Sequence, residues 1–236
     1  MKKAIQQAPL TCCLVGVCVL VYLLEELAGG ATNSATLLNL GANYGPFVRA
    51  GQWWRVFTAA FLHIGLTHLF LNMMVLYYLG RTIEELTGHL RMAVIYLVSI
   101  LMGNLVSVAV QPVTISAGAS TGIFGLFGAF LFMGSEFRQY PALRGLARQY
   151  LILVIINLVY DLIAPGIDIF GHLGGLVGGF LACALVGVPT LGEIHLRKRF
   201  LGGTILVLGF VILGKVGFFE GRNGLNSTAP STMFSN

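Results

Sequence analysis

Long stretches without a charged residue divide this chain, and they limit it to a small set of folds. No Lys, Arg, Asp or Glu stands between Lys3 and Glu25, and the whole block between Arg91 and Glu136 is uncharged. A helix of about 20 apolar residues spans the hydrocarbon core of a bilayer. The pattern therefore predicts an all-α membrane protein, a polytopic helical bundle with several spans.

The composition supports this prediction and excludes other classes of protein. Of the 236 residues, 56% are hydrophobic and only 10% are charged, and the mean hydropathy is +0.85. Soluble domains are about 25% charged, so this chain lacks the polar residues to cover a surface in water. A nucleic-acid-binding protein, a disordered chain and a soluble dinucleotide-binding enzyme are excluded.

Seven spans fit the uncharged stretches. The block after Arg91 is long enough for two crossings, and Gln111-Pro112 with Ser116, Ala117 and Gly118 mark the loop between them, because Pro and Gly break helices. The predicted spans are about Pro9–Leu24, Thr58–Gly80, Met92–Val110, Ser120–Gly134, Gln149–Ile163, Ile169–Val188 and Phe200–Phe219.

The basic residues predict the orientation in the membrane. With a cytoplasmic N-terminus, ten of them lie inside and only Arg49, Arg55, Lys215 and Arg222 lie outside. The ten are Lys2, Lys3, Arg81, Arg91, Arg138, Arg144, Arg148, Arg197, Lys198 and Arg199. Basic residues favour the cytoplasmic side, so we expect a multi-pass protein of the cell membrane with its C-terminus outside. The basic loops would face the anionic lipid bilayer.

The chain is predicted to have three parts. Residues 1–190 form a six-span core, residues 191–220 a basic inner loop and the seventh span, and residues 221–236 a disordered polar tail. The outer loop 28–57 is long enough to hold an extra structured element. It contains Trp54 and Arg55, which on their own are typical of an aromatic belt at the membrane surface with an arginine that reaches out to water.

Several polar residues within the spans are candidates for function, because polar groups are costly in a bilayer. His68 and Asn72 are four residues apart and so share one helix face. Ser120 follows Gly118-Ala119 at the start of the fourth span, and His172 opens the sixth. Each has a structural alternative: a hydrogen bond between helices, a helix cap or a packing position.

The predicted depth of these residues favours function. The second, fourth and sixth spans run in the same direction, and His68, Ser120 and His172 lie near the start of each. A serine and a histidine at one depth on neighbouring helices are the minimum nucleophile and base.

The joint pattern resembles the rhomboid intramembrane serine proteases over about residues 8–190. It consists of Trp54-Arg55 in a long first outer loop, His68-xxx-Asn72, Gly118-Ala119-Ser120 and His172-Leu173-Gly174-Gly175, with Glu84, Gly88 and Ile167-Asp168 in support. The seventh span is similar to the additional span of some bacterial members. The resemblance implies cleavage of client proteins in or near their transmembrane segments.

The resemblance also implies roles for single residues. Ser120 would be the nucleophile and His172 the general base. The side chains of His68 and Asn72 and the backbone N–H of Ser120 would line an oxyanion hole, and the ring of Phe124 would stack on His172. Thr121 follows the nucleophile where glycine is commoner in the family.

Glycines in the sixth span predict a close helix crossing. They recur every four residues at 171, 175 and 179 and at 174 and 178, which lets two helices approach each other. Gly175 and Gly179 are expected to face Gly122, Gly125 and Gly128 of the fourth span.

The sequence favours a Ser–His dyad over the alternatives. Asp161 and Asp168 precede His172 by eleven and four residues, and neither is expected to complete a triad. An aspartyl protease would place its two aspartates on different facing helices. No His-Glu-x-x-His string is present, so no catalytic metal or cofactor is expected. An inactive rhomboid-like protein that binds membrane clients is the alternative function.

Overall fold

The structure is a computed structural model that describes residues 8–164 and 166–220. Five of its helices are long and apolar enough to cross a membrane. They are α2 (Pro9–Leu27), α8 (His89–Val110), α10 (Pro141–Ile163), α11 (Ile169–Val186) and α12 (Leu196–Gly214), the last extended by the π-helical turn η3 (Lys215–Glu220). These helices correspond to the first, third, fifth, sixth and seventh predicted spans, so the chain is an all-α polytopic membrane protein.

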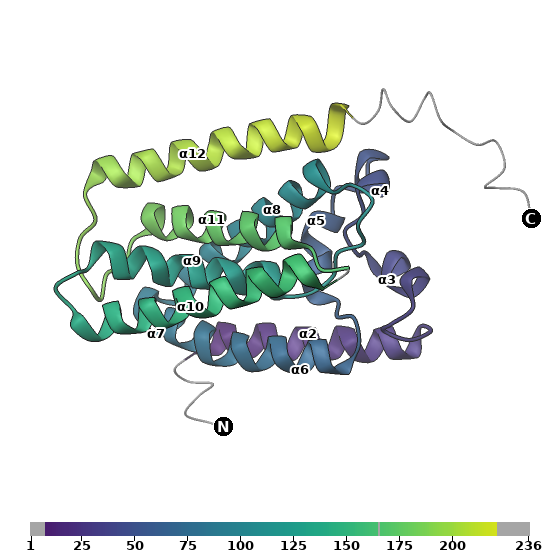
Figure 1. Cartoon of the computed structure of the whole chain (residues 1–236), viewed down its shortest axis with the longest axis horizontal. Helices are drawn as coiled ribbons and strands as arrows, with labels where there is room; N and C mark the ends of the chain where they lie inside the picture. Colours follow the sequence, from purple (N-terminus) through teal and green to yellow (C-terminus); the bar gives the residue numbers. More distant parts are fainter. Residues whose placement is uncertain (1–7, 165, 221–236) are drawn as a thin grey trace, which may run out of the picture.

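The predicted fourth span is α9 (Ser120–Glu136), a shorter helix of 17 residues at the centre of the bundle. It lies between α8, α10 and α11 in Figure 1, and its extensive contacts with all three bury most of its side chains. A helix that is apolar all round is expected in such a position. α12 lies at the edge of the bundle and packs mainly against α11.

The predicted second span is wrong in one respect, because it is bent rather than straight. The segment Arg55–Phe61 meets Leu66–Thr87 at 92°. The first segment holds α5 (Arg55–Thr58) and η1 (Ala59–Phe61), and the second holds α6 (Leu66–Val75), η2 (Leu76–Gly80) and α7 (Arg81–Thr87). Gly65 has a φ of +83°, a conformation that glycine adopts readily, so the chain turns there. His68 consequently lies in the first turn of α6.

The first loop is structured, as its length predicts. It contains α3 (Ser34–Leu40), α4 (Gly45–Arg49) and α5, which gather at one end of the bundle in Figure 1. The expectation that Arg55 reaches out to water is wrong, because the residue is only 6% exposed. Its Nη1 donates to the carbonyls of Leu38 (2.6 Å) and Ala42 (3.0 Å), so it holds the loop together. Trp54 beside it is exposed.

Glycines allow α9 and α11 to cross in close contact. A Cβ atom on Gly179 would clash with the backbone of Gly125, and one on Gly175 would clash with the carbonyl of Thr121. Gly128 meets the backbone of Leu176 in the same way. The predicted partner Gly122 is different, since it faces the ring of Tyr96 on α8. This crossing fixes the distance between the first turns of α9 and α11.

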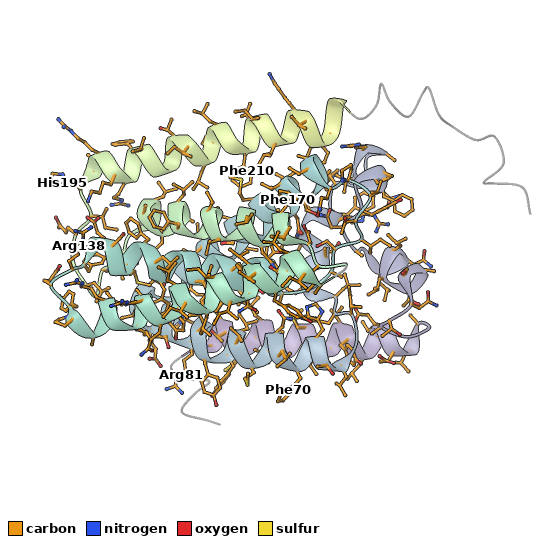
Figure 2. All side chains as sticks on the ribbon, in the orientation of Figure 1. Phe70, Arg81, Arg138, Phe170, His195 and Phe210 are labelled. Atoms are coloured by element: carbon orange, nitrogen blue, oxygen red, sulfur yellow. The ribbon has the colours of Figure 1, made fainter. Side chains whose placement is uncertain are left out.

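The α9–α10 and α11–α12 linkers lie at the end of the bundle away from α3 and α4. Arg138 and His195 lie at the same end in Figure 2, on the two linkers opposite α3 and α4, whereas Phe70 points away from the bundle on α6. The predicted disordered tail, residues 221–236, lies outside the described residues, as do Lys2 and Lys3.

Candidate active site

Three helices begin at the same end of the bundle and bring the predicted site residues together. They are α6, α9 and α11, and their first turns contain His68, Ser120 and His172. The Nε2 atom of His172 lies 2.8 Å from Oγ of Ser120. This distance is within hydrogen-bond reach, so the two side chains are placed as a nucleophile and a base require.

Ser120 is the first residue of α9, where backbone N–H groups have no partner within the helix. Among the described residues, no group accepts a hydrogen bond from the N–H of Ser120. The preceding turn is fixed by Gly118, whose N–H donates to the carbonyl of Ala59 at 2.9 Å. Its φ of +146° is a glycine conformation. The free N–H and the hydroxyl of Ser120 therefore share one corner of the bundle.

His172 is held from two sides. The ring of Phe124 stacks on it, with 4.2 Å between the ring centroids and 7° between the planes, in agreement with the implied stacking. Asp168 caps α11 by accepting a hydrogen bond from the N–H of Gly171 at 2.8 Å. The cap and the stacked ring fix the start of α11 and the plane of the imidazole.

The expectation that no aspartate contacts His172 is wrong. Oδ2 of Asp161 lies 2.6 Å from Nδ1 of His172, on the side of the ring away from Ser120. α10 and α11 are antiparallel and are joined by only five residues, so the last turn of one meets the first turn of the other. Two residues that are eleven positions apart in the sequence are therefore in direct contact. Asp168, the other candidate, serves as the helix cap.

His68 and Asn72 lie on the face of α6 beside the serine. Nδ1 of His68 accepts from the N–H of Ile64 (3.2 Å), and Nδ2 of Asn72 donates to the carbonyl of His68 (2.9 Å). A Cβ atom placed on Gly118 would lie 3.1 Å from Nε2 of His68 and 3.5 Å from Oγ of Ser120. A side chain at position 118 would therefore clash with His68, so only glycine fits beside the histidine and the serine here.

Two buried residues near the site were missed by the sequence analysis. Nε2 of His63 accepts from the N–H of Ala119 (3.4 Å), directly before the serine. The N–H of His63 in turn donates to the carboxylate of Glu25 on α2 at 2.9 Å. Both residues are fully buried. The available signal was a polar residue, His63, in an apolar stretch. It was not used because a straight second span would place His63 and His68, five residues apart, on different faces.

The remaining predicted residues lie outside this group. Trp54 and Arg55 belong to the first loop, and Gly175 and Gly179 to the crossing of α9 and α11. What lies at the centre is a hydroxyl, an imidazole hydrogen-bonded to it and a free backbone N–H. Such a set can activate a serine and stabilise a negatively charged oxygen.

The chain is similar in sequence to known proteins over most of its length. Rhomboid protease GluP of Bacillus subtilis (strain 168) is 37% identical over 199 residues, which cover 83% of this chain and 38% of that protein. RHOMBOID-like protein 6, mitochondrial, of Arabidopsis thaliana is 32% identical over 213 residues, covering 81% of this chain and 69% of the relative. Rhomboid-like protease 3 of Toxoplasma gondii is 38% identical over 152 residues, covering 62% and 57%.

A family model for the rhomboid domain matches residues 50–189. The match begins in the first loop, includes all the residues placed around Ser120 and His172 on α6, α9, α10 and α11, and ends just after α11. It covers more than half of the chain. The chain therefore belongs to the rhomboid family.

Proposed function

We propose that this protein is an intramembrane serine endopeptidase with Ser120 as nucleophile and His172 as general base. The observation that supports this most directly is the 2.8 Å contact between Oγ of Ser120 and Nε2 of His172. Both residues lie in the first turns of apolar helices, where a hydrogen-bonded serine and histidine have no evident packing purpose. Their contact is the geometry that nucleophilic catalysis requires.

The proposed reaction proceeds through an acyl-enzyme. The hydroxyl proton of Ser120 passes to Nε2 of His172 while Oγ bonds to the carbonyl carbon of the scissile peptide. The C–N bond then breaks, and the proton on Nε2 passes to the leaving amine. Water next attacks the ester and gives a proton to Nε2. That proton returns to Oγ as the acid leaves, so the enzyme is restored.

Three donors are proposed to stabilise the oxyanion. They are the N–H of Ser120, the imidazole of His68 and the second hydrogen on Nδ2 of Asn72, the first being donated to the carbonyl of His68. His68 and Ser120 border the position that a side chain on Gly118 would take, and Asn72 is one turn after His68 on α6. Donors fixed in advance around a developing charge are typically the largest contribution to such catalysis.

Gly118→Ala is expected to lower turnover by about 10²–10³-fold, the range that follows loss of one oxyanion donor. The new Cβ would lie 2.7 Å from Cε1 of His68 and would occupy the space proposed for the oxyanion. Gly51→Ala is the matched control, because Gly51 also has a positive φ (+102°) but has open space around it. Equal turnover in both variants, measured on a fluorogenic substrate, would place the oxyanion elsewhere.

The proposed substrates are transmembrane segments of client proteins. The site lies at one end of the bundle, where helices α6, α9 and α11 begin and where the positive-inside rule expects the non-cytoplasmic side. A helix shields its own peptide bonds, so clients should have helix-weakening residues near the cut. The preference for a small residue before the cut follows from the family resemblance alone.

The activity is tested by cleavage of a model substrate in reconstituted vesicles. The model substrate is a single-span peptide with Gly and Ala at the outer end of its helix and a fluorophore and quencher on either side. We expect cleavage that persists in EDTA and 1,10-phenanthroline, because the proposed reaction uses no metal. Activity that the chelators remove and zinc restores would contradict the serine mechanism. Binding of the peptide without cleavage would indicate the inactive, client-binding alternative.

A further inference from the structure

Asp161 stands at a position where its helix otherwise buries apolar side chains. α10 buries only Leu143, Ala147, Val154 and Asp161, which follow one another at spacings of four and seven and so form one stripe along the helix. The first three are small or apolar and pack against the bundle. Replacing a buried ion pair by apolar residues is often neutral or stabilising, so packing gives no reason for a carboxylate here.

The contacts of Asp161 point to His172. The two side chains are 2.6 Å apart and are 4% and 10% exposed, respectively. In the part of the chain that the structure describes, His172 is the charged or titratable group paired with Asp161. The carboxylate is therefore directed at the imidazole rather than at solvent or at a basic residue.

The stacking on Phe124 leaves two properties of the imidazole undetermined: which ring atom faces Ser120 and which nitrogen carries the hydrogen. Stacking on Phe124 fixes the plane of the ring, but a half-turn about the Cβ–Cγ bond preserves this plane and directs a carbon instead of Nε2 at Ser120. Stacking is also indifferent to which nitrogen carries the hydrogen. A hydrogen-bond acceptor beside Nδ1 settles both questions at once.

We propose that Asp161 is a positioning residue that orients His172 and selects its tautomer. An ionised carboxylate only accepts hydrogen bonds, so Nδ1 carries the hydrogen and the lone pair of Nε2 faces Ser120. When Nε2 takes the serine proton, the carboxylate stabilises the imidazolium without taking a proton itself. The proposal rests on the proposed function and replaces the expected dyad by a set of three residues from α9, α10 and α11.

The test is the turnover of Asp161→Asn on the model substrate. The amide can donate to Nδ1 and so favours the tautomer with its hydrogen on Nε2, directed at Ser120. We expect kcat to fall at least about 10²-fold, toward the roughly 10⁴-fold loss seen when the triad carboxylate of soluble serine proteases becomes an amide. KM should stay within about twofold, because Asp161 does not touch the substrate. Asp161→Glu, which keeps the carboxylate, should recover a large part of kcat.

The matched control is Val154→Ala on the same stripe of α10. Val154 is 2% exposed and lies two turns before Asp161, away from His172. A merely structural role for Asp161 predicts that both variants lower thermal stability and turnover together. The positioning role predicts a large loss of kcat in Asp161→Asn alone. Native kcat in Asp161→Asn, or an equal loss in Val154→Ala, would overturn the proposal.

A second measurement separates this proposal from the proposed function. The rate of labelling by a fluorophosphonate probe is compared in the native protein, Asp161→Asn and Ser120→Ala. We expect labelling of the native protein, slow labelling of Asp161→Asn and none of Ser120→Ala. Equal rates for the native protein and Asp161→Asn would overturn only the role of Asp161. A native protein that is neither labelled nor active would overturn both.

Discussion

Ser120→Ala is expected to abolish cleavage of the model substrate while the protein remains folded and inserted. The variant removes Oγ, which lies 2.8 Å from Nε2 of His172, and leaves the backbone of α9 in place. His172→Ala should have the same effect. Because the two side chains act as a unit, the double variant should be hardly worse than either single one. Cleavage is followed by fluorescence, and folding by thermal unfolding in detergent.

Ser135→Ala is the control for this prediction. Ser135 is on the same helix, near its other end, and its hydroxyl donates to the carbonyl of Phe132 within α9. We expect native turnover in this variant. Substantial cleavage by purified Ser120→Ala protein would show that another residue is the nucleophile.

Gly179→Val is expected to disable the enzyme by forcing α9 and α11 apart. A Cβ on Gly179 would clash with the backbone of Gly125, which cannot move aside as a flexible side chain can. Ser120 and His172 are on these two helices, and a shift of about 1 Å between reacting groups can cost about 10²-fold in rate. We expect a loss of at least that size in kcat, together with a lower midpoint of thermal unfolding.

Gly16→Val is the matched control, since Gly16 is on the membrane-spanning helix α2 and a Cβ there would meet nothing within 4 Å. It tests whether the same substitution is harmful in any apolar helix. Native turnover in fully inserted Gly179→Val protein would mean that the close crossing does not set the distance between serine and histidine.

The sequence predicted the helices well because the bilayer imposes a simple rule on them. Apolar stretches bounded by charges must be helical, so α2, α8, α11 and α12 were found with errors of a few residues at their ends. α10 begins eight residues before the predicted Gln149, because Arg144 and Arg148 lie within the helix. The bend before α6 was missed, because hydropathy is continuous from Thr58 to Gly80 and does not reveal the turn at Gly65. The bend depends on backbone conformation rather than on composition.

The residues of the site were predicted only in part, because the sequence indicates the direction of the helices but not how they pair. Ser120 and His172 could be placed at one depth because they lie near the starts of predicted spans that run in the same direction. His68 lies ten residues after the predicted start at Thr58, and the bend before α6 places it in a first turn. Asp161 was set aside because distance was judged along the chain. A tight antiparallel hairpin brings the end of α10 to the start of α11, and such a contact follows from the pairing of helices. Arg55 was misplaced because its buried acceptors are carbonyls, which no residue pattern identifies.

The most direct test of the account is to label the protein with a fluorophosphonate and to locate the modified residue by mass spectrometry. The serine mechanism predicts one modified residue, Ser120, in the native protein reconstituted in vesicles. It predicts no modification in His172→Ala, where the hydroxyl has lost its base, or after heat denaturation. Modification of another residue, or labelling of Ser120 that is unchanged without His172, would contradict the proposed active site.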